Sequence, residues 1–258
     1  MIAWRIHHKA ETVSTNVDAR VGSHGDVFTA DYQTAGRGRL DHKWLSPPKT
    51  NLMMSVVLSV ADLLPEHVAT LPLVVGLAVV KTVGSDVLGR PQPPENENFV
   101  LCRLRTARRS GPTVKLKWPN DVLIDGLKVA GILCERNGDN VIAGIGVNVG
   151  QTEFDKEIAD RATSLVPHVL QVPPVLEVRD TLLSELDKWY GIWRSAGFAA
   201  VYPEIVTVDF LKGREIAVRQ TDDDSAPIVG ISNGIMPDGS LDVGGTRAYA
   251  GEAHVEKI

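Results

Sequence analysis

The chain has 258 residues, of which 43% are hydrophobic and 23% are charged, which is ordinary for a globular protein and excludes a mainly disordered one. Its 27 Lys and Arg are outweighed by 32 Asp and Glu, and the resulting net charge of −5 disfavours a general nucleic-acid coat. Two cysteines are too few for a disulfide framework. The N-terminus lacks the apolar core of a signal peptide, and no apolar run has the roughly 20 residues of a membrane span. We therefore expect a soluble, cytoplasmic protein of one or two domains.

The first part of the chain is predicted to alternate short strands with helices and one long loop. Strands are predicted over residues 2–6, 27–32 and 52–60, and the last of these has apolar residues at every second position from Leu52. A short helix is predicted over residues 16–21 and a longer one over residues 65–87, where Pro72 either kinks the helix or marks its first turn. Residues 33–50 show no apolar period, and a loop this long in a compact domain is usually functional or disordered.

The rest of the chain is predicted to form further strands, an amphipathic helix and a small β-rich unit. Residues 89–112 carry several prolines and a basic cluster and are expected to form a surface insertion, with a solvated charge run favoured over an anion site. Strands are predicted over 113–118, 127–134 and 141–149, separated by turns at 119–121 and at Asp125-Gly126, the second a hairpin turn. Helices are predicted over 175–194 and then to about residue 207. We expect one domain over residues 1–207 and a second, of SH3-like size, over residues 208–258.

The long loop contains the sequence Gly36-Arg37-Gly38-Arg39. Its glycines allow the backbone to approach a ligand, and its two guanidinium groups match phosphate or carboxylate. No Gly-Lys-Ser/Thr follows, so the motif is not a P-loop, and it is not a dinucleotide-binding motif. Taken alone it leaves an RNA-binding loop and a merely flexible loop equally open.

A second motif, Lys117-Trp118-Pro119-Asn120-Asp121, ends a predicted strand. It delivers an amine, an amide and a carboxylate to one rim, a set that suits a nucleotide phosphate with its Mg²⁺. The alternative is a strand end whose aspartate caps its own turn.

Two predicted strands carry the remaining candidates. In regular alternation Lys128 shares a face with Ala130 and Ile132, where it either reaches solvent or holds an anion. Gly131 in mid-strand indicates close approach of a ligand or another backbone. Gly144 and Gly146 leave one strand face bare, which fits either a flat apolar ligand or a closely packed helix.

In this order and spacing the motifs resemble the biotin–protein ligase family. The matching pieces are Ser14-Thr15-Asn16, residues 33–39, Trp44, residues 117–121, residues 128–133, residues 144–148 and residues 162–165. The resemblance implies an α+β fold: a mixed-sheet catalytic domain of the class II aminoacyl-tRNA synthetase-like type, followed by an SH3-like β-barrel. It also implies a two-step reaction, in which biotin and ATP give biotinyl-5′-AMP and pyrophosphate, and a carrier lysine then takes the biotin with release of AMP.

The resemblance also implies residue roles. Arg37, Arg39 and Lys117 are expected to neutralise phosphate and carboxylate, Lys128 to hold the carboxyl oxygen of biotin, and Asp121 to orient the carrier lysine. The expected biotin contacts are Ser14, Thr15, Asn16, Gln33, Gly36, Arg37, Gly38, Arg39, Trp44, Lys128, Gly131, Gly144 and Gly146. The expected ATP contacts are Arg37, Arg39, Trp44, Lys117, Asn120, Lys128 and Asn148, with Mg²⁺ at Asn120 and Asp121. The loop over residues 33–50 is expected to become ordered when ligand binds and to exclude water.

The sequence departs from the family pattern at Asp41, where many members have glycine, and at His42, where they have arginine with Lys43 now adjacent. These changes bear on how tightly the adenylate is retained. Ser14 lies too near Met1 for an N-terminal helix-turn-helix, so no DNA-binding role is expected. The expected partner is a biotin carboxyl carrier protein or domain of acetyl-CoA carboxylase or a related carboxylase, with no membrane, and with homodimerisation left open.

Two other functions remain as alternatives at this point. A lipoate ligase or octanoyltransferase shares the scaffold, although the Gly-Arg-Gly-Arg loop and the β-rich tail argue against it. A non-catalytic module that binds anions or nucleic acid through its arginines is disfavoured by the net charge of −5.

Overall fold

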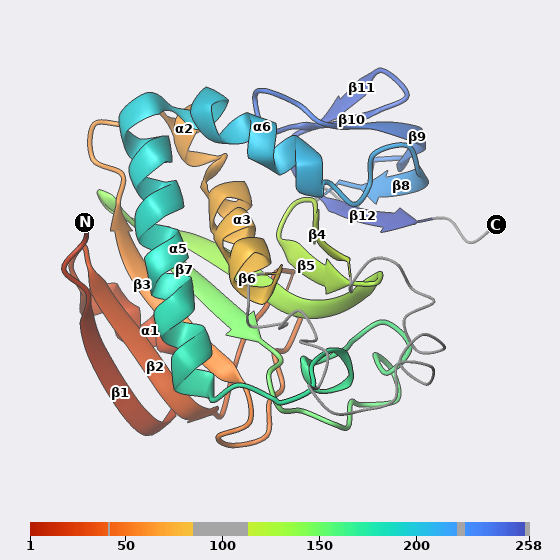
Figure 1. Cartoon of the computed structure of the whole chain (residues 1–258). Helices are drawn as coiled ribbons and strands as arrows, with labels where there is room; N and C mark the ends of the chain where they lie inside the picture. Colours follow the sequence, from red (N-terminus) through yellow and green to blue (C-terminus); the bar gives the residue numbers. More distant parts are fainter. Residues whose placement is uncertain (41, 85–112, 221–224, 256–258) are drawn as a thin grey trace, which may run out of the picture.

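The computed structural model describes residues 1–40, 42–84, 113–220 and 225–255. Two β-sheets and a set of helices make up this part of the chain (Figure 1). The larger sheet contains β1 (Arg5–Thr12), β2 (Asp26–Gln33), β3 (Leu52–Ser59), β4 (Val114–Lys117), β5 (Asp121–Ile124), β6 (Leu127–Asn137) and β7 (Asn140–Val147). Its strand order is β1-β2-β3-β7-β6-β5-β4. β1 runs parallel to β2 and every other neighbouring pair is antiparallel, so the expected mixed sheet is confirmed.

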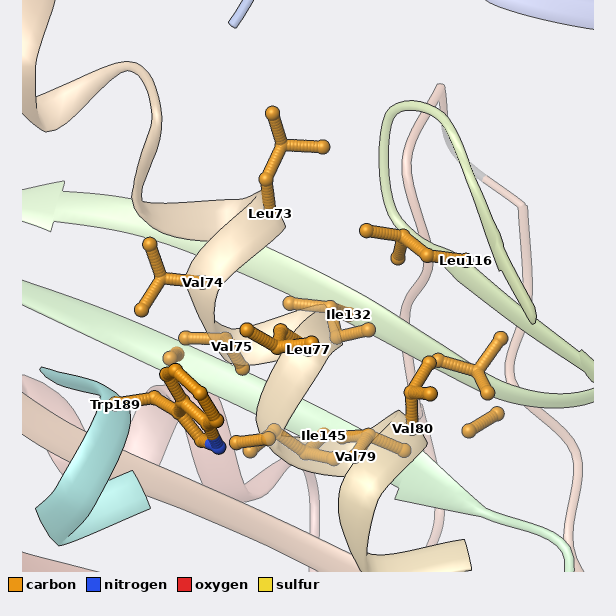
Figure 2. Close-up of a cluster of buried hydrophobic side chains, with 14 of the residues drawn as sticks. Leu73, Val74, Val75, Leu77, Val79, Val80, Leu116, Ile132, Ile145 and Trp189 are labelled. Carbon is orange, nitrogen blue, oxygen red and sulfur yellow. The ribbon is translucent and has the colours of Figure 1, made fainter. Parts of the chain in front are cut away.

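Helices α3 (Leu71–Gly84) and α5 (Val175–Ala196) cover one face of this sheet. Figure 2 shows side chains of α3 lying among Ile132 of β6, Ile145 of β7 and Trp189 of α5. The span Pro65–Gly84 is apolar and long enough to cross a membrane, but 67% of its most apolar window is buried inside the protein. Its apolar residues are therefore explained by the core that they form.

The remaining helices and 3-10 turns lie between or after the elements described above. Helix α1 (Thr15–Asp18) and a 3-10 turn (Ala19–Val21) follow β1, α2 (Pro65–Val68) precedes α3, a second 3-10 turn spans Val166–His168, and α6 (Phe198–Val208) follows α5. Pro72 is the second residue of α3, so it marks the first turn and does not kink the helix interior. The amphipathic stripe predicted for α5 is confirmed, because its Leu and Trp members are buried.

Two details of the large sheet differ from the prediction. β1 begins at Arg5 and ends at Thr12, beyond the predicted residues 2–6, because this edge strand is almost wholly exposed and has no apolar alternation to reveal it. The short β5 was not predicted, since its four residues lie between two turns. The turn after it is a hairpin as expected, and Asp125 and Gly126 have φ values of 50° and 88°, which fit a type I′ turn.

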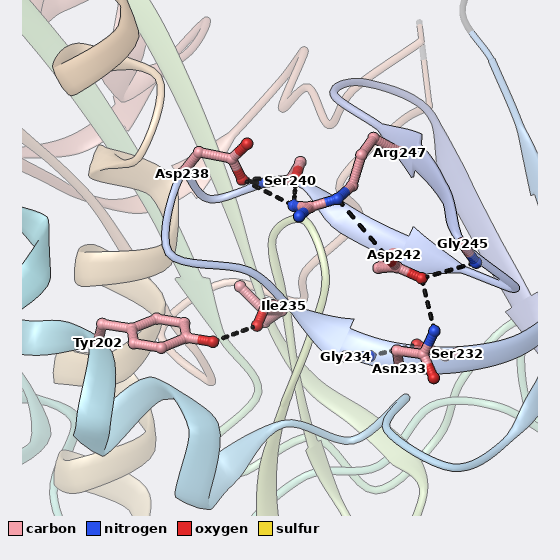
Figure 3. Close-up of polar contacts among 10 residues, drawn as sticks. All are labelled: Tyr202, Ser232, Asn233, Gly234, Ile235, Asp238, Ser240, Asp242, Gly245 and Arg247. Carbon is pink, nitrogen blue, oxygen red and sulfur yellow. Dashed lines mark hydrogen bonds and ion pairs between the residues drawn. The ribbon is translucent and has the colours of Figure 1, made fainter.

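The C-terminal residues form a second, antiparallel sheet of β8 (Glu215–Arg219), β9 (Ile228–Ile235), β10 (Leu241–Val243), β11 (Thr246–Ala248) and β12 (Glu252–Val255). Its order is β11-β10-β9-β8-β12, and in the part of the chain described here its two edge strands do not pair to close a barrel. Hydrogen bonds join it to the first unit, including Tyr202 Oη to the Ile235 carbonyl at 3.0 Å (Figure 3) and Trp118 Nε1 to the Gly239 carbonyl at 3.1 Å. The insertion predicted over residues 89–112 lies outside the described residues.

Candidate active site

Three glycines form a bare strip on the sheet face that α3 and α5 leave uncovered. Gly131 of β6 pairs with Gly146 of β7, and Gly144 lies two residues before Gly146 on the same strand. Their neighbours Ile132 and Ile145 are buried in the core on the opposite face. The strip is covered from outside by Asn16 of α1, which lies against Gly144, and by Trp44, which lies against Gly131 and Gly146. A helix residue therefore packs on the strip at Gly144, as one alternative predicted, while the Trp44 ring covers Gly131 and Gly146 and a ligand on the strip stays a prediction.

Lys128 lies on the open face, and the prediction that it shares a face with Ala130 and Ile132 is wrong. The ladder between β5 and β6 shifts by one residue at Val122 and Leu123, and a bulge of this kind redirects the side chains beside it. The Lys128 ammonium consequently lies 3.3 Å from the position that a Cβ on Gly131 would take. It forms an ion pair with Asp121 Oδ1 at 2.6 Å and lies 5.9 Å from the Trp44 ring centroid.

A buried polar network lies beside the glycine strip. Gln33 Oε1 accepts a hydrogen bond from the Thr15 backbone N–H at 2.7 Å and lies 3.1 Å from Thr15 Oγ1. Ser55 Oγ lies 2.7 Å from Thr15 Oγ1 and 2.6 Å from Asn16 Oδ1. Asn16 Nδ2 donates to Glu135 Oε2 at 2.6 Å. Thr15, Asn16 and Ser55 are each less than 5% exposed, so this network is fixed before any ligand arrives.

The loop that carries Gly36-Arg37-Gly38-Arg39, called here the arginine loop, is folded back on itself above the same face of the sheet. Gly38 N–H donates to the His42 carbonyl at 2.6 Å and Trp44 N–H donates to the Gly36 carbonyl at 2.9 Å. The Arg37 guanidinium lies 3.4 Å from Glu135 Oε1. Both predicted arginines are thus anchored at the site, since Arg39 Nη1 also donates to Asn120 Oδ1 at 3.3 Å and to the Gly251 carbonyl at 3.1 Å.

Cations outnumber carboxylates where β4 ends and β5 begins. Lys117 pairs with Asp121 in the β4–β5 ladder. Burial lowers the pKa of the Lys117 ammonium, an effect that Asp121 opposes and that Lys128 reinforces. A buried cation of this kind gains most from an anionic ligand, because the ligand's charge replaces the lost hydration. The rim formed by Lys117, Lys128 and Arg39 is therefore suited to phosphate or carboxylate.

Some predicted site residues are engaged elsewhere. The Asn148 amide donates to the Thr163 carbonyl at 3.0 Å and is buried, so it holds residues 163–165 in place. Ser14 is buried at the start of α1 and its side chain makes no capping hydrogen bond. Within the described chain no three His, Cys, Asp or Glu residues cluster as metal ligands. Asp121 is paired with Lys128 and Asn120 with Arg39, so these two residues do not fit a protein-held Mg²⁺.

Comparison with known proteins shows what this arrangement is similar to. The model of the biotin/lipoate A/B protein ligase family matches residues 10–151. The chain belongs to this family. It is 35% identical over 193 residues to a biotin–[acetyl-CoA-carboxylase] ligase of Mycobacterium tuberculosis, covering 72% of this chain and 64% of that protein. It is 34% identical over 184 residues to the bifunctional ligase/repressor BirA of Bacillus subtilis, covering 69% of this chain and 49% of that protein. The chain therefore spans between half and two thirds of the length of these relatives.

A solved member of the family has a similar architecture throughout. The biotin protein ligase of Aquifex aeolicus, in complex with biotin and ATP, superposes with a TM-score of 0.76 at 27% identity, covering 98% of this chain and 99% of that one. The likeness extends over both sheets, so the C-terminal sheet is part of the same scaffold.

Two residues of this candidate site were missed by sequence reasoning. Ser55 lies inside the strand predicted over residues 52–60 and Glu135 directly follows the strand predicted over residues 127–134, and neither was singled out. Each becomes recognisable when the register places Ser55 opposite Gly144 and Glu135 opposite Ile142. Of the departures noted above, His42 Nδ1 lies 3.7 Å from Glu252 Oε1, and Asp41 lies outside the described residues.

Proposed function

We propose that this chain is a biotin–protein ligase, which activates biotin with ATP and transfers it to a lysine of a biotin carrier domain. The observation that carries the proposal is that the glycine strip, the Lys128–Asp121 ion pair and the arginine loop lie together on the open face of the large sheet. The glycine strip accepts a flat ligand, the Lys128–Asp121 pair stands over Gly131, and the anchored arginine loop brings Arg37 and Arg39 to the same face. The resemblance to the Aquifex ligase with bound biotin and ATP adds to it.

The first step joins two anions. A carboxylate oxygen of biotin attacks the α-phosphorus of ATP, the bond to the leaving pyrophosphate breaks, and biotinyl-5′-AMP forms. The nucleophile is already ionised, so no general base is required, and the main obstacle is charge repulsion. Lys117, Lys128 and Arg39 offset this repulsion and hold the reactants in line. Each such contact in a water-excluded site contributes on the order of 2–4 kcal/mol to the transition state.

The ring of biotin is recognised in this proposal by the polar network at the start of α1. Thr15 and Gln33 are held by one another at 2.7 Å, so their remaining donors and acceptors are preorganised for the ureido group. The Gly131 and Gly146 backbones supply a flat surface, Asn16 lies on Gly144 at its edge, and Trp44 moves from this surface to cover the ligand.

The second step transfers the acyl group. The neutral amine of a carrier lysine attacks the carbonyl carbon of the mixed anhydride, the bond to AMP breaks, and the amine loses a proton as the amide forms. We assign Asp121 to orienting the incoming amine, because it already binds one ammonium group, that of Lys128, at 2.6 Å. The partner we propose is a biotin carrier domain of a carboxylase such as acetyl-CoA carboxylase.

The remaining assignments are proposals on the same basis. We expect Mg²⁺ to enter with the phosphates of ATP, since Asn120 and Asp121 are engaged by Arg39 and Lys128. Residues 1–207 form the proposed catalytic domain of the class II synthetase-like type, and residues 208–258 the proposed SH3-like domain. We place the reaction in the cytoplasm, where ATP is available and where Cys134 remains a free thiol.

The decisive experiment is incorporation of labelled biotin into a purified carrier domain, with and without ATP and Mg²⁺. Labelling that requires ATP, together with biotin-dependent exchange of pyrophosphate into ATP, is the expected result. Exchange that requires lipoate and ignores biotin would instead assign the chain to the lipoate branch of the family. Salt-sensitive RNA binding without ATP turnover would favour the non-catalytic alternative.

A further inference from the structure

We propose that Glu135 is a positioning residue that orients the ring-binding network. The inference rests on the proposed function and names a residue to which the sequence resemblance gave no role. Glu135 lies on β6, four residues after Gly131 and on the same open face. One of its carboxylate oxygens accepts from Asn16 at 2.6 Å, and the other lies 3.4 Å from Arg37.

The Glu135 carboxylate, 2.6 Å from Asn16 Nδ2, is the nearer of two acceptors that determine which way the Asn16 amide points, the other being the Leu133 carbonyl at 3.4 Å. A carboxylate only accepts hydrogen bonds, so Asn16 must direct its NH₂ group to Glu135 and its oxygen to Ser55. Ser55 then donates its single hydroxyl proton to Asn16 Oδ1 at 2.6 Å. Because this proton is committed, Ser55 Oγ accepts from the Thr15 hydroxyl, 2.7 Å away, and the Thr15 proton therefore points to Ser55 and not to Gln33 Oε1. The direction of each proton in the network is thus set from its Glu135 end.

The other end of the network faces the proposed ligand. Gln33 Oε1 is occupied by the Thr15 backbone N–H, so Gln33 Nε2 points the other way, toward Gly36 in the arginine loop. The site therefore presents Gln33 Nε2 as a fixed hydrogen-bond donor beside Gly36. Binding a ring that carries both N–H donors and a carbonyl acceptor depends on such a fixed pattern.

Burial of the Asn16 side chain makes the orientation of its amide rigid. Asn16 is 4% exposed and lies against Gly144, so its side chain has no room to rotate. Glu135 has a side chain 29% exposed, and its Oε1 lies 3.4 Å from the Arg37 guanidinium and 3.9 Å from that of Arg20. Arg20 contacts the same carboxylate from outside the loop, and it therefore provides a matched control.

The test compares Glu135→Gln, Glu135→Ala and Arg20→Gln by thermal unfolding, by calorimetric titration with biotin, and by pyrophosphate exchange with biotin and ATP varied separately. We expect Glu135→Ala to raise KM and Kd for biotin at least tenfold, with KM for ATP changed less than twofold. The isosteric Glu135→Gln should raise them three- to fivefold, because its amide satisfies Asn16 in only one of two orientations. Arg20→Gln should match the wild type.

A role through Asn16 also predicts non-additivity. In an Asn16→Ala background, Glu135→Gln should add less than a twofold further change in biotin affinity. Biotin parameters within twofold of wild type in Glu135→Gln, or a full and additive effect in the Asn16→Ala background, would overturn the inference while exchange by the wild type upholds the proposed function. A wild-type chain that neither binds biotin nor exchanges pyrophosphate would overturn both.

Discussion

Replacing Gly144 with alanine tests how closely α1 packs on the sheet. A Cβ at this position would lie 2.9 Å from Asn16 Cγ and closer still to Asn16 Oδ1. Asn16 cannot yield easily, because its amide is hydrogen-bonded to Ser55 and Glu135. Overpacking of a tight site costs about 1–3 kcal/mol, and a displaced buried amide adds a cost of about the same size. We expect Gly144→Ala to lose about 3 kcal/mol of unfolding free energy, which lowers the Tm by roughly 6–12 °C in a protein of this size.

Two other glycines serve as comparisons. At Gly146 the added Cβ would lie 2.8 Å from Trp44 Nε1, but Trp44 belongs to a surface loop and its buried N–H has no hydrogen-bond partner to lose. Gly146→Ala should therefore change stability by less than about 1 kcal/mol while weakening biotin binding more than tenfold. Gly191 lies inside α5 with nothing within 4 Å of the added atom, so Gly191→Ala should stabilise by about 0.5–1 kcal/mol.

Thermal unfolding followed by circular dichroism, with biotin titrations on the same samples, measures all three. A Tm for Gly144→Ala within 2 °C of the wild type would refute the packing argument. Equal destabilisation by Gly144→Ala and Gly146→Ala would refute the distinction between a fixed amide and a yielding ring.

Four further changes have defined outcomes. Lys128→Ala should slow biotinyl-adenylate formation at least 100-fold in pyrophosphate exchange with the fold intact, and near-normal exchange would remove it from its role. Arg39→Gly should speed adenylate release, seen as labelling of nearby lysines, and unchanged release rates would contradict a retaining loop. Because burial lowers the pKa of Lys117, kcat/KM for ATP should fall at a lower alkaline pH than an ordinary lysine would give, and Lys117→Arg should remove that fall. Burial alone would raise the pKa of Asp26, but hydrogen bonds from the backbone and from Arg5 outweigh it and lower the pKa to about 2. Asp26→Asn should therefore lose about 2 kcal/mol of unfolding free energy at neutral pH. Urea unfolding should show the difference from the wild type vanishing between pH 4 and pH 2.

Much of the fold was predictable because its signals are local. Alternating apolar residues revealed β3, the three- and four-residue spacing revealed α3 and α5, and Asp125-Gly126 revealed a hairpin. β1 and β5 were misplaced or missed for the converse reason. An exposed edge strand and a four-residue strand have little apolar pattern, and they exist because neighbouring strands complete their hydrogen bonds.

The candidate site was predictable in its residue types and less so in its geometry. Arg37, Arg39, Lys117 and Lys128 are recognisable from sequence as candidate anion-binding residues. The face that Lys128 occupies depends on a register shift between β5 and β6, which no local pattern encodes. Glu135 likewise gains Asn16 and Arg37 as neighbours only through the packing of α1 and of the arginine loop on the sheet.

The sequence by itself determined the classes of strand and helix, the arginine loop and the family resemblance, because each depends on residues near one another in the chain. Only the tertiary structure decided which side of the sheet is open, that Lys128 faces it, and that Asn16, Ser55 and Glu135 form one network. The physical reason is that these contacts join segments up to 119 residues apart, and their directions are set by strand register and burial, which are properties of the assembled sheet.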